Sequence, residues 1–301
     1  MSRLSKEELV KIQEGLQKDG FYVLRGLIPT ETLDEAEEHL DTIVDSLAQH
    51  QLDNNVTESL FRNEPFDKRL VHVYRDRLNE APKIFRSELH LAGLFPIFFN
   101  ENLLDIAEHV LGTSEIRLYP NYTCRPKVPG GTERHTVLWH QDAGYTGSKT
   151  WHALNDYTDE QLDAALRCMV NVWIPLVDVT ANNGCMQFIP GSHRNGVQPH
   201  VERKEYLELD ADIMKTCVHQ AVDMDAKRGD VILFGQYLYH CGLPNKSDTV
   251  RWSLDFRFQD AAASTLRKEP GHLARSKVSP DAVVKDSDHW CRLELGGENP
   301  K

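Results

Sequence analysis

A histidine and an aspartate stand two residues apart at His140 and Asp142, and both side-chain types bind catalytic metals. The pair closes an apolar, β-rich stretch over residues 136–139. In a β-strand, residues two apart lie on the same face, so both side chains can point into one cavity. His39 and Asp41 have the same spacing, but they fall in a helical pattern, where such residues do not face each other. We therefore expect His140 and Asp142 to be metal ligands.

A third ligand would complete a triad of two histidines and one carboxylate. The best candidate is His240, which follows a buried-looking strand over residues 230–234 and the turn before it. Such a triad leaves coordination positions open and is typical of non-haem Fe(II) that activates O2. The alternative is that His240 is an ordinary surface histidine. A further pair, His200 and Glu202, lies in a loop after Pro199.

An arginine and a serine beyond His240 predict a carboxylate-binding site. Residues 251–256 alternate as a strand, so Arg251 and Ser253 share one face. A buried arginine beside a hydroxyl can bind a carboxylate through two hydrogen bonds. Next to the triad, this pair would hold the distal carboxylate of a 2-oxo diacid. The alternative for Arg251 is a surface ion pair on an edge strand.

Two other protein classes fit parts of this pattern. Zinc accepts histidine and aspartate, so the three ligands alone also allow a zinc-dependent isomerase or hydrolase on a β-barrel. Such an enzyme has no need of Arg251 and Ser253, which therefore favour the iron hypothesis. A non-catalytic ligand-binding protein on the same scaffold is disfavoured by the complete triad.

The N-terminal part, residues 1–112, is predicted to be mainly helical. Ser5 and Glu8 form a capping-box pattern before a helix that ends at Gly20. A short strand over 21–24 precedes a second helix over 32–50, and a third helix over 103–111 is capped by Asn100 and ended by Gly112. Residues 51–86 look irregular and polar.

The part that follows, residues 113–262, is predicted to be a β core. Short β-rich segments alternate with Gly, Pro and Asn turns, at residues 116–123, 136–139, 169–176, 185–189, 220–224, 231–234 and 251–258. Such spacing indicates a sandwich or barrel. Residues 178–184 and 227–230 look like hairpin turns, and the polar tail over 263–301 is expected to wrap the surface. The fold class is therefore mainly β with helical cover, in a single domain.

The composition excludes some partners. The chain has 301 residues and a net charge of −12, with 34 Lys and Arg against 46 Asp and Glu. Because nucleic acid is bound by clustered Lys and Arg, we expect no nucleic-acid partner. No signal-peptide core or membrane-length apolar stretch is visible, so we expect a cytoplasmic protein with no membrane partner. The six cysteines lack CxxC spacing and are expected to be reduced.

Several motifs occur in the order typical of one family, and from Gly20 to about Gln259 the chain resembles the phytanoyl-CoA dioxygenase family of Fe(II)/2-oxoglutarate oxygenases. Residues 19–26 are similar to the family's N-terminal strand, and the segment from Trp173-Ile174-Pro175-Leu176 to Pro190-Gly191-Ser192-His193 is similar to a characteristic family segment. At the site, His140-Gln141-Asp142 matches the family's HxD triplet, and Gly229-Asp230 matches its Gly-Asp turn. His240 matches the family's distal histidine, and Arg251 matches its 2-oxoglutarate arginine.

The resemblance implies a double-stranded β-helix (jelly-roll, cupin-like) core with helical cover. It implies Fe(II) bound by His140, Asp142 and His240, and 2-oxoglutarate bound by Arg251. The implied reaction oxidises an unactivated C–H of a small-molecule substrate while 2-oxoglutarate and O2 become succinate and CO2. No catalytic acid or base is required.

Further roles follow from the resemblance. Trp173 matches a family tryptophan beside the cosubstrate, although core packing explains it equally well. Asn121 lies near a family cosubstrate-contact position that is often methionine. Related halogenases carry Ala or Gly in place of the carboxylate, so Asp142 disfavours halogenation. Acyl-CoA substrates would need a basic patch, and the slight basic excess of residues 62–86 fits a solvated helical face as well.

The connection after the triplet, residues 143–163, is long and rich in aromatic and polar residues. Long connections of this kind are often lids over an active site. We expect it to line the substrate pocket, although its aromatic side chains would also fit a role that only anchors the loop. The candidate pocket residues are Tyr145, Lys149, Trp151 and Tyr157, with His152 beside them.

Overall fold

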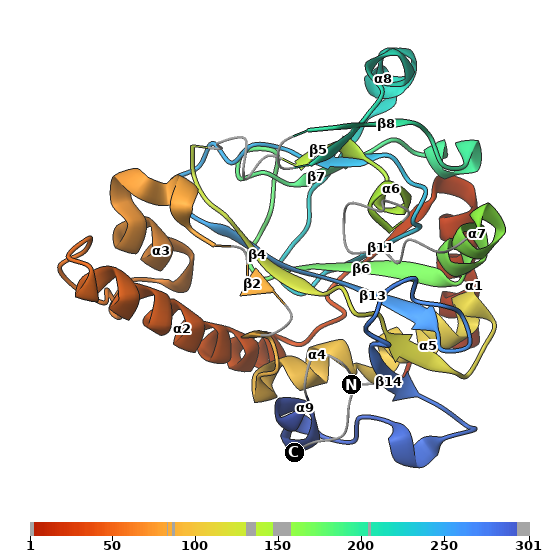
Figure 1. The fold of residues 1–301 in the computed structure, drawn as a ribbon, viewed down its shortest axis with the longest axis horizontal. Helices are drawn as coiled ribbons and strands as arrows, with labels where there is room; N and C mark the ends of the chain where they lie inside the picture. Colours follow the sequence, from red (N-terminus) through yellow and green to blue (C-terminus); the bar gives the residue numbers. More distant parts are fainter. Residues whose placement is uncertain are drawn as a thin grey trace.

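The computed structural model describes residues 3–82, 84–85, 88–130, 137–146, 158–203 and 206–293. Two antiparallel sheets face each other, and helices cover the outer face of the larger sheet (Figure 1). The larger sheet has the strand order β1-β11-β6-β13-β3-β14, and its branch β4 pairs with β13 and with β2. The smaller sheet has the order β10-β7-β12-β5.

The strands of the larger sheet come from both halves of the chain. They are β1 (Phe21–Leu24), β2 (Ile84–Phe85), β3 (Ile116–Leu118), β4 (Thr123–Lys127), β6 (Met169–Pro175), β11 (Val231–Phe234), β13 (Arg251–Asp260) and β14 (His272–Arg275). The smaller sheet contains β5 (Val137–His140), β7 (Met186–Phe188), β10 (Val222–Met224) and β12 (His240–Gly242). A separate ribbon pairs β8 (His200–Glu202) with β9 (Leu207–Leu209).

Helices α2, α4, α5 and α9 lie below the larger sheet in Figure 1, on the side opposite the smaller sheet. The helices are α1 (Lys6–Asp19), α2 (Thr30–Asp53), α3 (Phe66–Tyr74), α4 (Phe95–Phe98), α5 (Glu101–Leu111), α6 (Asp142–Thr146), α7 (Asp159–Arg167), α8 (Ala211–Cys217) and α9 (Ser287–Arg292). The predicted combination of helical cover and β core is therefore observed.

The predicted helix caps are present. At the start of α1, Ser5 and Glu8 each accept a hydrogen bond from the other's backbone N–H. Gly20 ends this helix with φ of +85°, a conformation that glycine adopts without strain. Asn100 caps α5 by accepting from the first turn of backbone N–H groups.

Strand β13 separates the hydrophobic core from the site. Trp252, Leu254, Phe256 and Phe258 belong to the core cluster that includes the helical cover. The alternate residues 251, 253, 255 and 257 are polar or charged and lie on the opposite face. The alternation predicted for residues 251–256 is therefore observed, and it continues to Phe258.

Two segments predicted as irregular contain helices. Helix α3 lies within residues 51–86, and it buries Phe66, Leu70 and Val73 at helical spacing. This apolar pattern is short and is flanked by charged residues, so the sequence alone does not indicate a helix here. Helix α7 begins within the expected loop 143–163, where Thr158 and Gln161 form a capping box.

Two predicted strands and two predicted turns were wrong in detail. The predicted strand 116–123 is divided, because β3 ends at Leu118 and β4 starts at Thr123. The expected strand 220–224 is shortened to β10. The turns at 178–184 and 227–230 are not hairpins: they connect strands of different sheets, β6 to β7 and β10 to β11. A bridge between Val179 and Ala226 shows that the two crossings lie side by side.

The expected surface tail contributes to the core. Strand β14 extends the larger sheet beside β3. In α9, Trp290 is fully buried, and its indole N–H donates to the Leu89 carbonyl over 3.1 Å. The polar composition of the tail conceals this one anchoring side chain.

Candidate active site

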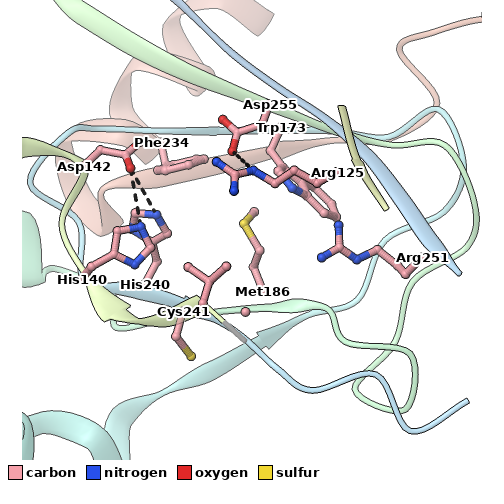
Figure 2. A pocket seen from close by; sticks show the side chains of 12 residues that line it. Arg125, His140, Asp142, Trp173, Met186, Phe234, His240, Cys241, Arg251 and Asp255 are labelled. Atoms are coloured by element: carbon pink, nitrogen blue, oxygen red, sulfur yellow. Dashed lines mark hydrogen bonds and ion pairs between the residues drawn. The ribbon is translucent and has the colours of Figure 1, made fainter. Parts of the chain in front are cut away.

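The two candidate histidine ligands come from neighbouring strands of the smaller sheet. His140 ends β5, His240 begins β12, and the two residues lie opposite each other in the antiparallel pairing. Their ring centroids are 4.0 Å apart (Figure 2). Strand pairing thus brings together two histidines that are far apart in the sequence.

Asp142 completes the group from the start of α6. It lies beyond the end of β5, so the turn into the helix places its carboxylate, and not the strand alternation that we expected. Its Oδ1 lies 3.5 Å from Nε2 of His140 and 3.8 Å from Nε2 of His240. Among the described residues, these three side chains form a buried group whose ligand atoms lie within 4.8 Å of one another.

Backbone carbonyls fix the orientation of both imidazole rings. Nδ1 of His140 lies 2.7 Å from the Leu138 carbonyl, and Nδ1 of His240 lies 2.9 Å from the Leu238 carbonyl. Since a carbonyl only accepts, both Nδ1 atoms must carry the proton. Nε2 is therefore the ring nitrogen that each histidine can offer to a metal, and both Nε2 atoms face Oδ1 of Asp142.

The charge states also suit a metal. Burial, with a contribution from His140, lowers the pKa of His240 to about 3, so this imidazole is neutral at pH 7. Burial alone would raise the pKa of Asp142, but Arg257, His140 and His240 together outweigh burial, so the pKa lies well below its usual value. Two imidazoles and one carboxylate suit Fe(II), and they are also compatible with zinc.

Arg257 is a site residue that the sequence analysis missed. Its Nη2 donates to Oδ2 of Asp142 over 2.6 Å, and its Nη1 donates to the Asn121 carbonyl over 3.2 Å. The alternation that assigned Arg251 and Ser253 to one face continues to Arg257, and following it two steps further would have found this residue.

Arg251 and Ser253 form the predicted polar pair. Arg251 donates to the Ser253 hydroxyl, and its guanidinium carbon lies 5.4 Å from the centre of the Trp173 ring. Arg251 is 4% exposed, and its Nε has no hydrogen-bond partner among the described residues. Burial, with the charge of Arg125, lowers the pKa of Arg251 to about 10, so it remains a cation at pH 7. This guanidinium can still accept an anionic partner.

Lys127 is a second residue that the sequence analysis missed. It lies opposite Arg251 in the pairing of β4 with β13, is 4% exposed, and donates to the Leu243 carbonyl. Arg125 and Lys127 are two residues apart on β4 and so lie on the same face, a spacing that is visible in the sequence. Pro126 stands between them, and because proline is unusual in a strand, the sequence does not look like a strand here.

A cavity between the two sheets joins the triad to Arg251 (Figure 2). Arg251 and Trp173 line one end and the triad lines the other, with Met186, Phe234 and Cys241 among the walls. Arg125 also faces the cavity, and its Nε donates to Asp255 over 3.1 Å. The cavity therefore has a metal-ligating end and a cationic end.

The middle residue of the triplet anchors the ligand loop. The Gln141 amide donates to the Gly196 and Tyr237 carbonyls and accepts from the backbone N–H of Gln198. The backbone N–H of Gln141 donates to Nε2 of His200 over 3.0 Å. His200 is thus a support behind the triplet, which its sequence context did not reveal.

The other predicted site residues have varied positions. Asn121 lies between β3 and β4, not on a strand as expected, and it contributes a backbone carbonyl to Arg257. Tyr145 packs edge-on against His140, and its hydroxyl accepts from the Leu207 N–H, while burial raises its pKa. The predicted pocket residues Lys149, Trp151, His152 and Tyr157 lie outside the described residues.

Comparisons with known proteins identify the family. The family model of phytanoyl-CoA dioxygenase matches residues 16–253, so the chain belongs to that family. The dioxygenase aneA of Aspergillus aculeatus is 24% identical over 285 residues, which is 93% of this chain and 82% of that protein. Phytanoyl-CoA dioxygenase 1 of rice (Oryza sativa subsp. japonica) is 29% identical over 116 residues, 38% of this chain and only 41% of the rice protein.

A solved structure shares the fold. EctD from S. alaskensis, crystallised with 2-oxoglutarate and 5-hydroxyectoine, superposes with a TM-score of 0.58 at 19% identity, over 86% of this chain and 77% of EctD. EctD was also crystallised with bound Fe. This likeness confirms the predicted oxygenase fold class, a sheet-rich, cupin-like core with helices. Among the helices in the described parts of the chain, none combines the length and apolar character that crossing a membrane requires.

Proposed function

We propose that this protein is an Fe(II)- and 2-oxoglutarate-dependent dioxygenase that hydroxylates an unactivated C–H bond of a small molecule, on a double-stranded β-helix core. The observation that carries the proposal is the buried group of His140, Asp142 and His240, which shares one cavity with Arg251. A zinc hydrolase would use the triad but not the buried cations at the far end of the cavity.

The triad residues would hold the metal without rearrangement. The Nε2 atoms of His140 and His240 and Oδ1 of Asp142 already converge, and both Nδ1–H groups are engaged elsewhere. Iron with 2-oxoglutarate supplies the oxidation: the substrate C–H becomes C–OH while 2-oxoglutarate and O2 become succinate and CO2. The balance needs no acid or base from the protein, and we assign none.

The cationic end of the cavity would hold the distal carboxylate of 2-oxoglutarate. Arg251 offers its Nε–H, which has no hydrogen-bond partner among the described residues, while its Nη1 donates to the Ser253 hydroxyl. Lys127, directly opposite Arg251 in the strand pairing, adds a buried amine that a bound carboxylate would favour in its charged form. Basic groups at one end and a dication at the other match a cosubstrate that is a dianion.

Binding and orientation are the other tasks of the protein. Trp173 under Arg251 and the walls formed by Met186 and Phe234 exclude water around the cosubstrate. Arg125 faces the same cavity and is 30% exposed at its side chain, so it lies where a substrate with an anionic group can reach it.

An anaerobic titration tests the proposal directly. Adding Fe(II) and then 2-oxoglutarate should produce a charge-transfer band in the visible region. His140→Ala should abolish the band by removing a metal ligand, and Arg251→Ala should weaken the dependence on 2-oxoglutarate. Arg275→Ala, which removes a surface ion-pair cluster with Asp105 and Glu108, is a matched control and should leave the band unchanged. Absence of a band in the unmodified protein contradicts the proposal.

Turnover provides a second test. With Fe(II) and O2, the protein should release succinate from 2-oxoglutarate, because uncoupled turnover occurs without the true substrate. Screening amines, amino-acid derivatives, phosphonates, acyl thioesters and polycyclic natural products should then find a compound that increases succinate release and gains one oxygen atom. A product that is rearranged but has no added oxygen would replace hydroxylation by another 2-oxoglutarate-dependent oxidation.

A further inference from the structure

We propose that Arg257 is a positioning residue that keeps Asp142 a one-oxygen ligand of the metal; this inference rests on the iron site proposed above. The two oxygens of the carboxylate have separate partners. Oδ1 faces Nε2 of His140 and of His240, at 3.5 and 3.8 Å. Oδ2 accepts from Nη2 of Arg257 over 2.6 Å.

This division decides how the carboxylate can bind a cation. A carboxylate with two free oxygens can bind a metal through one or both of them. Because Arg257 occupies Oδ2 with a charge-assisted hydrogen bond, only Oδ1 remains for the metal. The protein would then supply three ligand atoms, one each from His140, Asp142 and His240.

Arg257 is itself held in place. Its Nη1 donates to the Asn121 carbonyl over 3.2 Å and lies 3.7 Å from Oδ1 of Asp255. Its side chain is 7% exposed, so water and salt screen the pair with Asp142 only weakly. A guanidinium fixed at several points can fix the carboxylate in turn, whereas a mobile cation could not.

Metal affinity and the absorption band together test this role. Anaerobic Fe(II) titrations in the presence of saturating 2-oxoglutarate would compare the unmodified protein with Arg257→Gln and Arg257→Lys. Loss of a residue that orients a ligand typically weakens metal binding by about 10–100-fold, and this is the change expected for Arg257→Gln, with a shifted band. Arg257→Lys keeps the charge but cannot reach both Asp142 and the Asn121 carbonyl, so it should be intermediate, about tenfold weaker.

Arg69→Gln is the matched control. Arg69 is also buried, and it holds Asp41, Asp45 and the Leu60 carbonyl far from the cavity. This variant should be less stable but should bind Fe(II) with unchanged affinity, which separates positioning from a general loss of stability.

The outcomes distinguish this inference from the proposed function. If the unmodified protein gives no band with Fe(II) and 2-oxoglutarate, the proposed function fails. If it gives the band, and Arg257→Gln gives the same band at the same affinity, the positioning role alone is overturned. If Arg257→Gln does not fold, Arg257→Lys decides: an affinity and band equal to those of the unmodified protein overturn the inference, and a weaker, shifted complex supports it.

Discussion

Lys127 and Arg251 lie directly opposite each other on strands β4 and β13, and both side chains are buried. The carboxylates near them are paired elsewhere among the described residues, Asp142 with Arg257 and Asp255 with Arg125. Two buried basic groups that have no anionic partner among the described residues destabilise the unliganded protein when both are charged. A bound dianion would remove this cost, so the pair favours a dicarboxylate at this end of the cavity.

The protonation of Lys127 should make 2-oxoglutarate binding depend on pH. Burial, and then the charge of Arg251, lower the pKa of Lys127 well below its usual value; Arg125 lowers it further, while Cys241 and Cys185 oppose the shift. A bound carboxylate favours the ammonium form and raises this pKa. Binding therefore takes up a proton, and affinity should be constant below the pKa of the free protein and fall as the pH rises through it.

Anaerobic calorimetry checks this prediction. It would measure the affinity of the iron-loaded protein for 2-oxoglutarate from neutral to alkaline pH. Lys127→Arg is the control, because arginine stays charged across the range and should remove the pH dependence. An equally steep pH dependence in Lys127→Arg would assign the effect to another group.

Arg251 and Ser253 should contribute unequally to 2-oxoglutarate affinity. Arg251→Met removes a charged hydrogen-bond donor, so the free energy of 2-oxoglutarate binding should weaken by about 1.5–3 kcal/mol. This corresponds to about 10–100-fold weaker binding. Ser253→Ala removes a neutral hydroxyl and should cost about 1 kcal/mol. The measurement is the 2-oxoglutarate dissociation constant, with the Fe(II) affinity of each variant as the internal control; equal effects of the two variants would contradict the proposed geometry.

The sequence pattern was most informative where the periodicity is local. The alternation of Arg251 and Ser253 predicted their shared face, and the capping residues Ser5 and Asn100 predicted where helices begin. The same alternation contained Arg257 but was not followed that far. Lys127 was missed because its strand contains Pro126 and was not recognised as a strand.

Other features depend on long-range register, which local patterns do not encode. His140 and His240 meet because β5 pairs with β12, a relationship that spacing alone could not fix. The family resemblance supplied the order of the ligands, whereas the support of the triplet by His200 depends on a backbone contact with Gln141. A hydrogen bond of this kind leaves no recognisable motif in the sequence.

His200 should be needed for tight metal binding although it is not a ligand. His200→Ala removes the acceptor for the Gln141 N–H, and an unsatisfied buried N–H costs about 1–3 kcal/mol, which the ligand loop can relieve only by moving. Fe(II) affinity should therefore fall.

Gly144→Ala should act similarly, because a Cβ there would lie 2.8 Å from the His200 ring. His193→Ala, at another histidine that contacts a backbone carbonyl, is the control, and equal Fe(II) affinities in all three variants would exclude the supporting role.

Trp290 should stabilise the fold without affecting the site. It is fully buried in α9, packs edge-on against Phe98 and at a tilt against His90, and donates to the Leu89 carbonyl. Replacing such a side chain by alanine leaves a cavity and an unpaired carbonyl, so Trp290→Ala should lower the free energy of unfolding by about 3–5 kcal/mol. Denaturant unfolding measures this change, and Trp290→Phe, which retains most of the packing, should lose less. The Fe(II) affinity of the folded variant should equal that of the unmodified protein, because α9, which contains Trp290, lies below the larger sheet, on the side opposite the smaller sheet (Figure 1). A loss below about 1 kcal/mol would mean that the C-terminal segment does not anchor the larger sheet and would restore the surface tail that the sequence predicted.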